Sequence, residues 1–581
     1  MQFEWLDWVL LVVFFVLSIG IGLYYSRDAG KGLAEFFLGG RTLSWWMAGT
    51  SMVATTFAAD TPLLVAGLVA QNGISGNWIW WNMLLGGMLT TFFFARYWRK
   101  SGVVTEVELI ELRYGGKPAA FLRGFKAVYL GLFLNAVIIG WVNKAMTTIL
   151  IAFFGLDPFT ALLYVSAAML FVAVYTAASG LMGVAVTDAI QFIVAMVGCI
   201  VLAILVVQSP EVGGVSGLQS RLPSWALDFF PTMGTDSSSA GQALSIGLGA
   251  FFARIGVQWW ASWYPGGEPG GGGYVAQRMM SCRDEKSSVY ATLFFQIAHY
   301  ALRPWPWILV GLSAIVLYPQ LGAGEKEQGF VLAMRDYLPA GMRGLLLAAF
   351  FAAYMSTIAT QLNWGASYLM NDLYRRFIRP QSTERHLVMI SRVVTLLLMF
   401  VSLWVTTRLQ TIESAWGFII ECGAGLGMVL ILRWYWWRIN AWSEISATFT
   451  PFVAYAISHV WMKQSFPESF LFTVTVTTIV WIFVTFITRP ESAETLQAFY
   501  RRVEPAGWWG VVADSLGKKV DNSQLPALLV CWISGILLGY SVLFFIGEII
   551  FLHFGTAAVY FVVGLIGFWG LRMMLPRTFT G

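Results

Sequence analysis

The chain has 581 residues, of which 58% are hydrophobic and only 12% charged, and its mean hydropathy is +0.69. A soluble globular protein carries about 25% charged residues, so this composition excludes a water-soluble body and predicts a membrane protein. The net charge is only +5, and no nucleic-acid partner is expected. The apolar runs are about 17 to 25 residues long, which suits helices that cross roughly 30 Å of hydrocarbon and excludes a barrel of short alternating strands.

Apolar runs follow one another along the whole chain and predict an all-α polytopic membrane protein with about 15 transmembrane helices. They lie near 5–25, 45–70, 78–97, 122–151, 159–177, 180–207, 242–264, 287–318, 342–370, 387–407, 415–434, 446–462, 469–488, 525–547 and 555–575. The amino terminus lacks the basic region and cleavage site of a signal peptide and is interpreted as a retained first span. The few cysteines and histidines are scattered, so neither a disulfide framework nor a zinc or haem site is expected.

Lysine and arginine concentrate in alternate connections, which predicts the orientation of the chain. The connections at 26–41, 96–126, 278–286, 373–392 and 489–519 are basic, whereas those at 71–77, 152–158 and 208–241 are poor in basic residues. Cytoplasmic loops carry the excess of Lys and Arg. We therefore expect a multi-pass protein of a plasma membrane, here a bacterial inner membrane, with the N-terminus outside and the C-terminus in the cytoplasm.

Two segments depart from uniform apolar helix. Residues 53–62 place Asp60 and Pro62 within a run of small and hydroxyl residues, and residues 263–274 contain two prolines and six glycines. Unwound backbone is tolerated in lipid only where it lines a cavity or is buried in protein. Two interrupted spans in corresponding places, five spans apart, favour a transporter with inverted repeats. An ordinary re-entrant or surface loop remains the alternative for the second segment.

Five short motifs resemble the solute:sodium symporter family, which contains sugar, proline, pantothenate and sialic acid carriers. They are FFLGGRTLSWW at 36–46, TDAIQ at 187–191, GYVAQR at 273–278 followed by DEK at 284–286, AAYMST at 352–357 and DLYR at 372–375. The resemblance covers residues 5–440 and implies the leucine-transporter-like fold. It divides the chain into an extra N-terminal helix (1–30), a first five-helix repeat (45–207), a second (242–440) and four additional C-terminal helices (441–581).

The resemblance implies a sodium site between the first broken span and a later helix. A hard cation needs about five or six oxygen ligands. By the family pattern these are the backbone oxygens of Ala54, Phe57 and Ala353 and the side chains of Ser356 and Thr357. The alternative is that these hydroxyls only bond to a carbonyl one turn back.

Asp188 matches a family aspartate that helps sodium to leave or joins a second sodium site. The hydroxyls expected beside it fall at Ala359 and Thr360, so one of the two is missing. We expect Asp188 and Thr360 to form an exit path or an incomplete second site, and a structural hydrogen-bond role for Asp188 remains open.

The substrate is expected beside the two breaks. The candidate residues are Asp60, Thr61, Trp81, Trp260, Tyr264 and Glu421. Tryptophan and tyrosine also form the ordinary aromatic belt of the membrane interface. Four further charges lie in or beside spans, namely Lys144, Arg254, Glu268 and Arg303, and each must pair internally or meet a ligand.

The sugar carriers have glutamines where this chain has Thr61 and Ile420, so their binding mode cannot be copied. The sequence therefore predicts a sodium-coupled secondary active transporter that imports a small polar organic solute, such as a sugar derivative or a carboxylate, by alternating access. We expect Na⁺, the solute and the lipid bilayer as partners and a monomer as the functional unit. A membrane sensor and a proton-coupled transporter are the alternatives, and no constellation typical of an enzyme is found.

Overall fold

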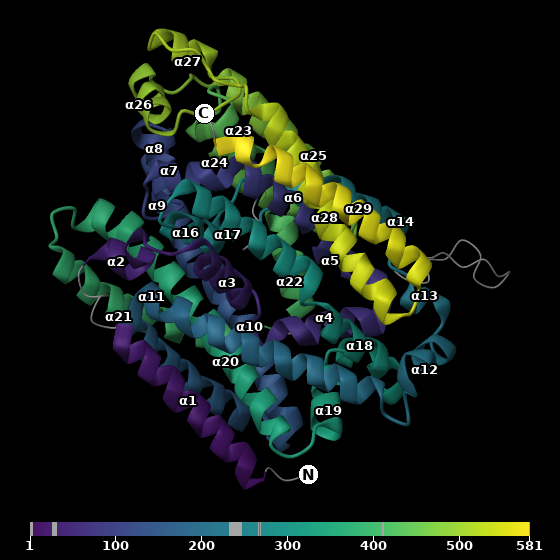
Figure 1. Cartoon of the computed structure of the whole chain (residues 1–581). Helices are drawn as coiled ribbons and strands as arrows, with labels where there is room; N and C mark the ends of the chain where they lie inside the picture. The colour runs from purple at the N-terminus through teal and green to yellow at the C-terminus, as the bar shows by residue number, and fades with distance from the viewer. Residues whose placement is uncertain are drawn as a thin grey trace.

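The computed structural model describes residues 4–25, 32–231, 247–264, 267, 269–409 and 412–579. Within those ranges the chain is helical, and the only β-structure is three isolated bridges. Figure 1 shows the two chain ends at opposite ends of the helical bundle, the N-terminus near α19 and the C-terminus near α7 and α23. Such an arrangement is expected for a chain that crosses a bilayer an odd number of times.

The helices divide into three groups along the chain. The first group is α1 (Trp5–Tyr25), α2 (Leu33–Leu38), α3 (Trp45–Thr55), α4 (Asp60–Asn72), α5 (Trp78–Trp81), α6 (Met83–Leu89), α7 (Ala95–Ser101), α8 (Glu108–Arg113), α9 (Gly116–Val128), α10 (Asn135–Phe154) and α11 (Pro158–Val207). The second is α12 (Gly214–Arg221), α13 (Ser224–Leu227), α14 (Leu248–Ala253), α15 (Trp259–Ala261), α16 (Gly273–Ser281), α17 (Glu285–Ile297), α18 (Trp305–Leu317), α19 (Gln328–Tyr337), α20 (Met342–Ser367), α21 (Glu384–Thr406), α22 (Ile412–Cys422) and α23 (Leu426–Tyr435). The third is α24 (Ala441–Ala456), α25 (Glu468–Ile487), α26 (Ala493–Val503), α27 (Gly510–Ser515), α28 (Leu525–Ile550) and α29 (Phe554–Met574).

Short turns of other helix types join or extend these helices. The 3-10 turns are η1 (Gly39–Arg41), η2 (Ile74–Asn77), η7 (Ala323–Glu325) and η10 (Pro576–Phe579). The wider π-helical turns are η3 (Thr90–Phe94), η4 (Tyr129–Leu134), η5 (Arg254–Gln258), η6 (Ala298–Leu302), η8 (Tyr368–Ile378) and η9 (Ile457–Trp461). Because π-helical turns often occur at functional sites, η6 is a candidate position for functional side chains.

Eight helical segments in the described ranges are long and apolar enough to cross a membrane, and the bent pair α3 and α4 makes a ninth. Three shorter apolar helices lie at Trp5–Leu17, Pro158–Val174 and Leu426–Tyr435. The chain is thus a polytopic, all-helical membrane protein. Each of the fifteen predicted ranges is largely helical where the structure describes it, with interruptions in several of them, and the number of membrane crossings stays a prediction.

One boundary differs from the prediction. The spans expected at 159–177 and 180–207 belong to one continuous helix, the 50-residue α11. No proline separates them, and a single interior glycine costs a helix only about 1 kcal/mol. The sequence therefore has no signal strong enough to end the helix at this point.

The first helix is fixed to the body of the protein by a buried carboxylate. Asp7 on α1 accepts hydrogen bonds from the backbone N–H groups of Gly341 (2.8 Å) and Gly344 (2.7 Å) at the start of α20. The first N–H groups of a helix lack partners within the helix and carry partial positive charge, so this contact stabilises both helices at once.

The connections predicted to share one side of the membrane meet in space. Arg41 donates to the carbonyl of Gly102 (2.7 Å), Arg376 donates to Glu111 (2.7 Å) and Lys100 pairs with Glu504 (3.1 Å). Each of these contacts joins two of the basic connections. At the other end of the bundle, Trp78 donates to the carbonyl of Phe229 (2.7 Å). Alternate connections thus lie at opposite ends, as an up-and-down path requires.

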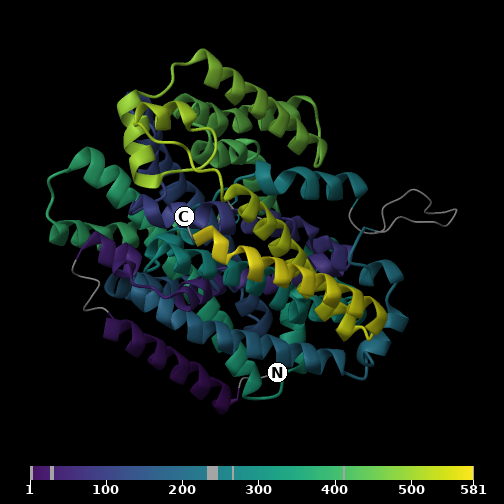
Figure 2. The ribbon, with the colours of Figure 1, turned by 45° about the horizontal axis from the view of Figure 1, so that its top comes forward.

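The C-terminal hairpin of α28 and α29 lies along the outside of the bundle, as Figure 2 shows. It contacts α6 and η6, and three hydrogen bonds from side chains to backbone carbonyls join it to α6, α5 and α18. Trp532 donates to Leu85 (2.9 Å), Tyr540 donates to Trp81 (2.8 Å) and Trp305 donates to Leu543 (3.0 Å). The hairpin therefore holds these helices in place from the outside of the bundle.

Candidate functional site

The first break separates α3 from α4. Helix α3 ends at Thr55, residues 56–59 are not helical, and α4 begins at Asp60 with a change of direction of 59°. The break falls within the predicted segment 53–62. Some backbone groups of the break bond to each other: Phe57 N–H donates to Ala54 O (2.9 Å) and Thr61 N–H donates to Ala58 O (3.2 Å). Other carbonyls there take their partners from side chains.

Arg303 binds the carbonyls at the end of α3. Its Nη1 donates to Val53 O and its Nη2 to Thr56 O, both at 2.9 Å, and its side chain is buried. Within the described residues it forms no salt bridge with Asp60 or Glu421, while Glu268 lies outside them. Arg303 therefore does not pair with Asp60 or Glu421, and its charge is directed to the partially negative end of a helix. Its contact with a ligand stays a prediction.

The π-helical turn η6 places His299 beside the same break. Thr56 Oγ1 lies 2.9 Å from Nδ1 of His299, and Arg303 Nη2 also donates to Nδ1. A guanidinium can only donate, so Nδ1 is an acceptor and the ring proton lies on Nε2. Arg303, His299 and Thr56 thus form one connected group at the first break.

The residues of the predicted sodium site meet where α20 packs against the end of α3. Thr357 Oγ1 donates to Thr55 O at 3.1 Å, so this hydroxyl points across to the broken helix and does not bond to a carbonyl one turn back. The other four predicted ligands, Ala54, Phe57, Ala353 and Ser356, are all buried in the same region. The arrangement brings together hydroxyl and carbonyl oxygens, which are the ligand type that hard cations take.

The residues of the predicted exit path are only partly described. Thr360 Oγ1 lies 3.3 Å from Thr55 Oγ1 and accepts from Arg278 Nη2 at 2.9 Å. Asp188 lies in α11, which packs against both α3 and α20, but its side chain is outside the described part of the structure. Of the other charges predicted in or beside spans, Arg254 lies over the ring of Phe466, 5.1 Å from its centre, and Lys144 lies in α10; both side chains are half-buried.

The second break, between α15 and α16, lies against a third break, between α22 and α23, that was not predicted from the sequence. Helix α15 ends at Ala261 and α16 begins at Gly273, while the predicted span 415–434 is divided into α22 and α23. Trp263 N–H donates to Gly423 O (3.1 Å), and Gly425 N–H donates to Ala261 O (2.9 Å). Two interrupted helices thus satisfy each other's backbone groups. The signal was present in the closely spaced glycines of 423–427, although glycine alone is weak evidence for a break.

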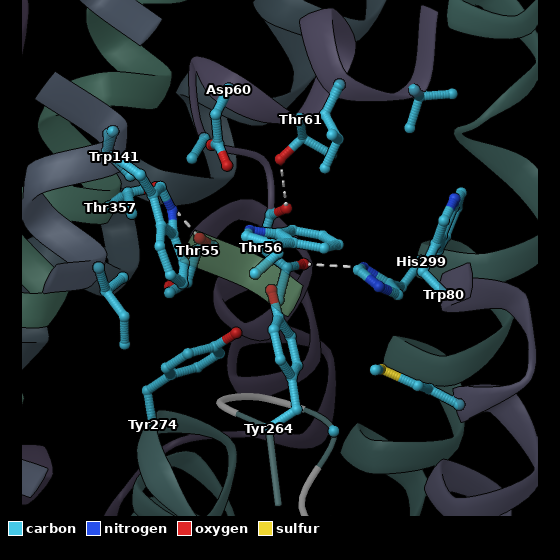
Figure 3. Close-up of a pocket in the computed structure, with 18 of the residues that line it drawn as sticks. Thr55, Thr56, Asp60, Thr61, Trp80, Trp141, Tyr264, Tyr274, His299 and Thr357 are labelled. Carbon is cyan, nitrogen blue, oxygen red and sulfur yellow. Dashed lines mark hydrogen bonds between the residues drawn. The ribbon is translucent and has the colours of Figure 1, made fainter. Parts of the chain in front are cut away.

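A cavity with about 780 Å³ of empty space, part of it open to solvent, lies between the first break, η6 and the second break. Figure 3 shows Asp60 and Thr61 entering it from α4, His299 from η6, and Tyr264 and Tyr274 from the opposite side. Aromatic rings form much of the lining, and they come from Trp80, Trp141, Tyr264, Tyr274, Tyr300 and Trp416.

Three of the six predicted substrate residues line this cavity, namely Asp60, Thr61 and Tyr264, and three lie elsewhere. Trp81 is fully buried against Trp78 and Phe544. Trp260 donates its indole N–H to Gly256 O (2.8 Å), and Glu421 is buried at the end of α22. Tyr274, His299, Trp141 and Gln361 also line the cavity but were not predicted as substrate contacts. Gln361 follows Thr357 by four residues and so shares its helix face.

Comparison with known proteins defines the class. Residues 36–449 match the model of the Sodium:solute symporter family. The match covers more than half of the chain, and the chain belongs to this family. It is a sodium-coupled symporter, with Na⁺ as the coupling ion, and not an enzyme.

Individual relatives are distant. The sodium/glucose cotransporter of Vibrio parahaemolyticus is 24% identical over 509 residues, which cover 84% of this chain and 91% of that protein. Sodium/glucose cotransporter 4 of Danio rerio is 25% identical over 482 residues, covering 75% and 68%. The solved structure of a Na⁺-coupled sialic acid symporter in a substrate-bound, outward-open state has 21% identity and a TM-score of 0.68, and it covers 84% of this chain and 99% of that one. The last comparison establishes a shared fold.

The pairing of the second and third breaks leads to a first prediction. A Cβ at Gly423 would lie 2.5 Å from Trp263 O, so Gly423→Ala must push the two backbones apart and should cost about 1–3 kcal/mol. The control is Gly417→Ala within the preceding helix α22, where nothing lies within 4 Å of the added atom. We expect a lower thermal unfolding midpoint for Gly423→Ala only. Equal midpoints for the two variants would contradict the pairing.

A second prediction concerns Arg303. Lysine keeps the charge but cannot reach two carbonyls with a planar fork, so Arg303→Lys should lose a charged hydrogen bond, about 1.5–3 kcal/mol. We expect a lower unfolding midpoint and weaker ²²Na⁺ binding to purified protein. Arg438→Lys is the matched control, because Arg438 donates to Thr488 O (2.6 Å) away from the cavity. Unchanged sodium binding in Arg303→Lys would show that Arg303 does not shape the first break.

Proposed function

We propose that this symporter binds Na⁺ between α3 and α20 and uses the sodium gradient to import a small polar organic solute through the adjacent cavity. The observation that carries the proposal is the hydrogen bond from Thr357 on α20 to Thr55 O at the end of α3. Thr55 and Thr357 also line the cavity. One pair of residues thus connects the proposed ion site to the proposed solute site.

The proposed ligands are Ala54 O, Phe57 O, Ala353 O, Ser356 Oγ and Thr357 Oγ1. Ions bound there would hold α20 against the broken helix, because the five oxygens come from both sides of that contact. A ligand shifts a conformational equilibrium only by its difference in affinity for the two states. Sodium would therefore favour the state in which α3, α4 and α20 are arranged for solute binding.

The proposed solute site comprises the cavity, with Asp60, Thr61 and Tyr264 as its predicted contacts. The hydroxyls of Thr61 and Tyr264 and the carboxylate of Asp60 give the cavity the polar groups that a sugar derivative or a carboxylate would need for hydrogen bonding. Thr61 Oγ1 donates to Thr56 O at 3.3 Å, and so a bound solute would meet this hydroxyl chiefly as an acceptor.

We also propose the architecture that the sequence predicts. Its parts are an N-terminal helix at 1–30, two inverted five-helix repeats at 45–207 and 242–440, and a C-terminal extension at 441–581, with about 15 spans in all. The breaks at α3–α4 and α15–α16, in the second and seventh predicted spans, support the repeats. The meeting of the basic connections at one end supports an outside N-terminus and a cytoplasmic C-terminus. We propose a bacterial inner membrane as the location and the monomer as the functional unit.

The test of the sodium site needs no knowledge of the solute. The double variant Ser356→Ala/Thr357→Ala removes both side-chain ligands, and we expect the half-saturation concentration of ²²Na⁺ binding to rise at least tenfold. The measurement is a scintillation proximity assay on purified protein.

The matched control is Ser391→Ala/Thr395→Ala on α21. Both hydroxyls are buried and donate one turn back, to Leu387 O (2.8 Å) and Ser391 O (2.9 Å). This control should bind sodium like the wild type. A sodium affinity that is the same in both double variants would refute the proposed site.

A further inference from the structure

Asp60 is a buried carboxylate that has no ion-pair partner within 4.0 Å among the described residues, and Arg303 acts on it only at longer range. Its side chain is 3% exposed and lines the cavity. Oδ1 has no hydrogen-bond partner in the part of the chain that the structure describes. No Lys, Arg or His in that part lies within 4.0 Å of either carboxylate oxygen. Figure 3 shows the carboxylate directed from the start of α4 into the cavity.

The cation that also lines the cavity is already bound elsewhere. Arg303 directs both Nη atoms to the carbonyls of Val53 and Thr56 at 2.9 Å. Its charge therefore stabilises the end of α3, and Asp60 does not receive a hydrogen bond from it. The N-terminus of α4 contributes only about half a unit of positive charge to Asp60. A buried carboxylate is costly unless it is paired. No described side chain supplies Asp60 with a full positive charge at ion-pair distance.

The rest of the lining is suited to a cation. Six aromatic rings, from Trp80, Trp141, Tyr264, Tyr274, Tyr300 and Trp416, border the same space. The faces of such rings carry negative potential and attract ammonium groups, and quaternary and substituted amines are bound in cages of this type. The rings are a poor environment for an inorganic ion, which requires oxygen ligands on all sides.

We propose that the transported solute carries a protonated or quaternary amine, which pairs with the carboxylate of Asp60 and packs against the aromatic rings of the cavity. The proposal rests on the proposed function for the identity of the cavity as the solute site. It narrows the class of polar solutes to those with an ammonium group, such as amino acids, betaines, amino alcohols and amino sugars. Neutral sugars and simple carboxylates fall outside it.

The first test compares amines with isosteres that lack the amine. Purified wild-type protein in Na⁺ is titrated with choline and 3,3-dimethyl-1-butanol, with proline and cyclopentanecarboxylate, and with glucosamine and glucose. Binding is read as the shift of the thermal unfolding midpoint. We expect at least one amine to bind at least tenfold more tightly than its isostere. A panel in which no amine shifts the midpoint, or in which each isostere shifts it equally, overturns the proposal.

The second test changes the carboxylate. Asp60→Asn keeps the size of the side chain but removes its charge, and we expect at least a tenfold loss of affinity for the amine found above. Binding of ²²Na⁺ without solute should change less than twofold. The matched control, Asp157→Asn, alters an exposed carboxylate at the start of α11 and should bind both ligands like the wild type.

Other outcomes assign Asp60 a different role. Loss of ²²Na⁺ binding in solute-free Asp60→Asn would make Asp60 a ligand of the ion, and unchanged amine affinity would make it only a helix cap; either result overturns the proposal. The isostere comparison uses wild-type protein and decides the question even if Asp60→Asn does not fold. Amine binding that is independent of Na⁺ would contradict the proposed coupling while leaving the amine site intact, so the two proposals fail separately.

Discussion

The structure depends on one constraint: a backbone N–H or C=O group in the membrane interior has no water to bond to and must find a partner in the protein. Three interrupted helices meet this constraint with tertiary contacts. At the first break the carbonyls of Val53 and Thr56 are bound by Arg303, and that of Thr55 by Thr357. At the second and third breaks, the backbones around Trp263 and Gly423 bind each other.

The same contacts explain why the proposed ion site and the proposed solute site lie side by side. A broken helix presents carbonyl oxygens in mid-membrane, and these are the groups that a sodium ion requires. Thr357 belongs both to the contact that holds the first break and to the lining of the cavity. Any change in the packing of α20 against α3 is therefore felt by both ligands, which is the physical requirement for coupling.

Much of the site could be predicted from local sequence. The first break was found because Asp60 and Pro62 stand in a small-residue run, and Asp60, Thr61 and Tyr264 do line the cavity. Trp81 was predicted to contact the substrate, but it is its neighbour Trp80 that lines the cavity. Successive residues on a helix point about 100° apart, and the sequence alone does not show how the helix is rotated about its axis. The break between α22 and α23 was missed because its partners lie some 160 residues earlier in the chain.

The sequence by itself determined the class of protein, the all-helical membrane architecture and the positions of two breaks, because hydropathy, charge placement and glycine or proline content act locally. Only the tertiary structure decided what each buried charge binds. In the described residues Arg303 donates to helix carbonyls and forms no salt bridge with a carboxylate, and Oδ1 of Asp60 has no hydrogen-bond partner. Pairing in a low-dielectric interior depends on distances of a few ångströms between residues far apart in the chain, and no local pattern encodes them.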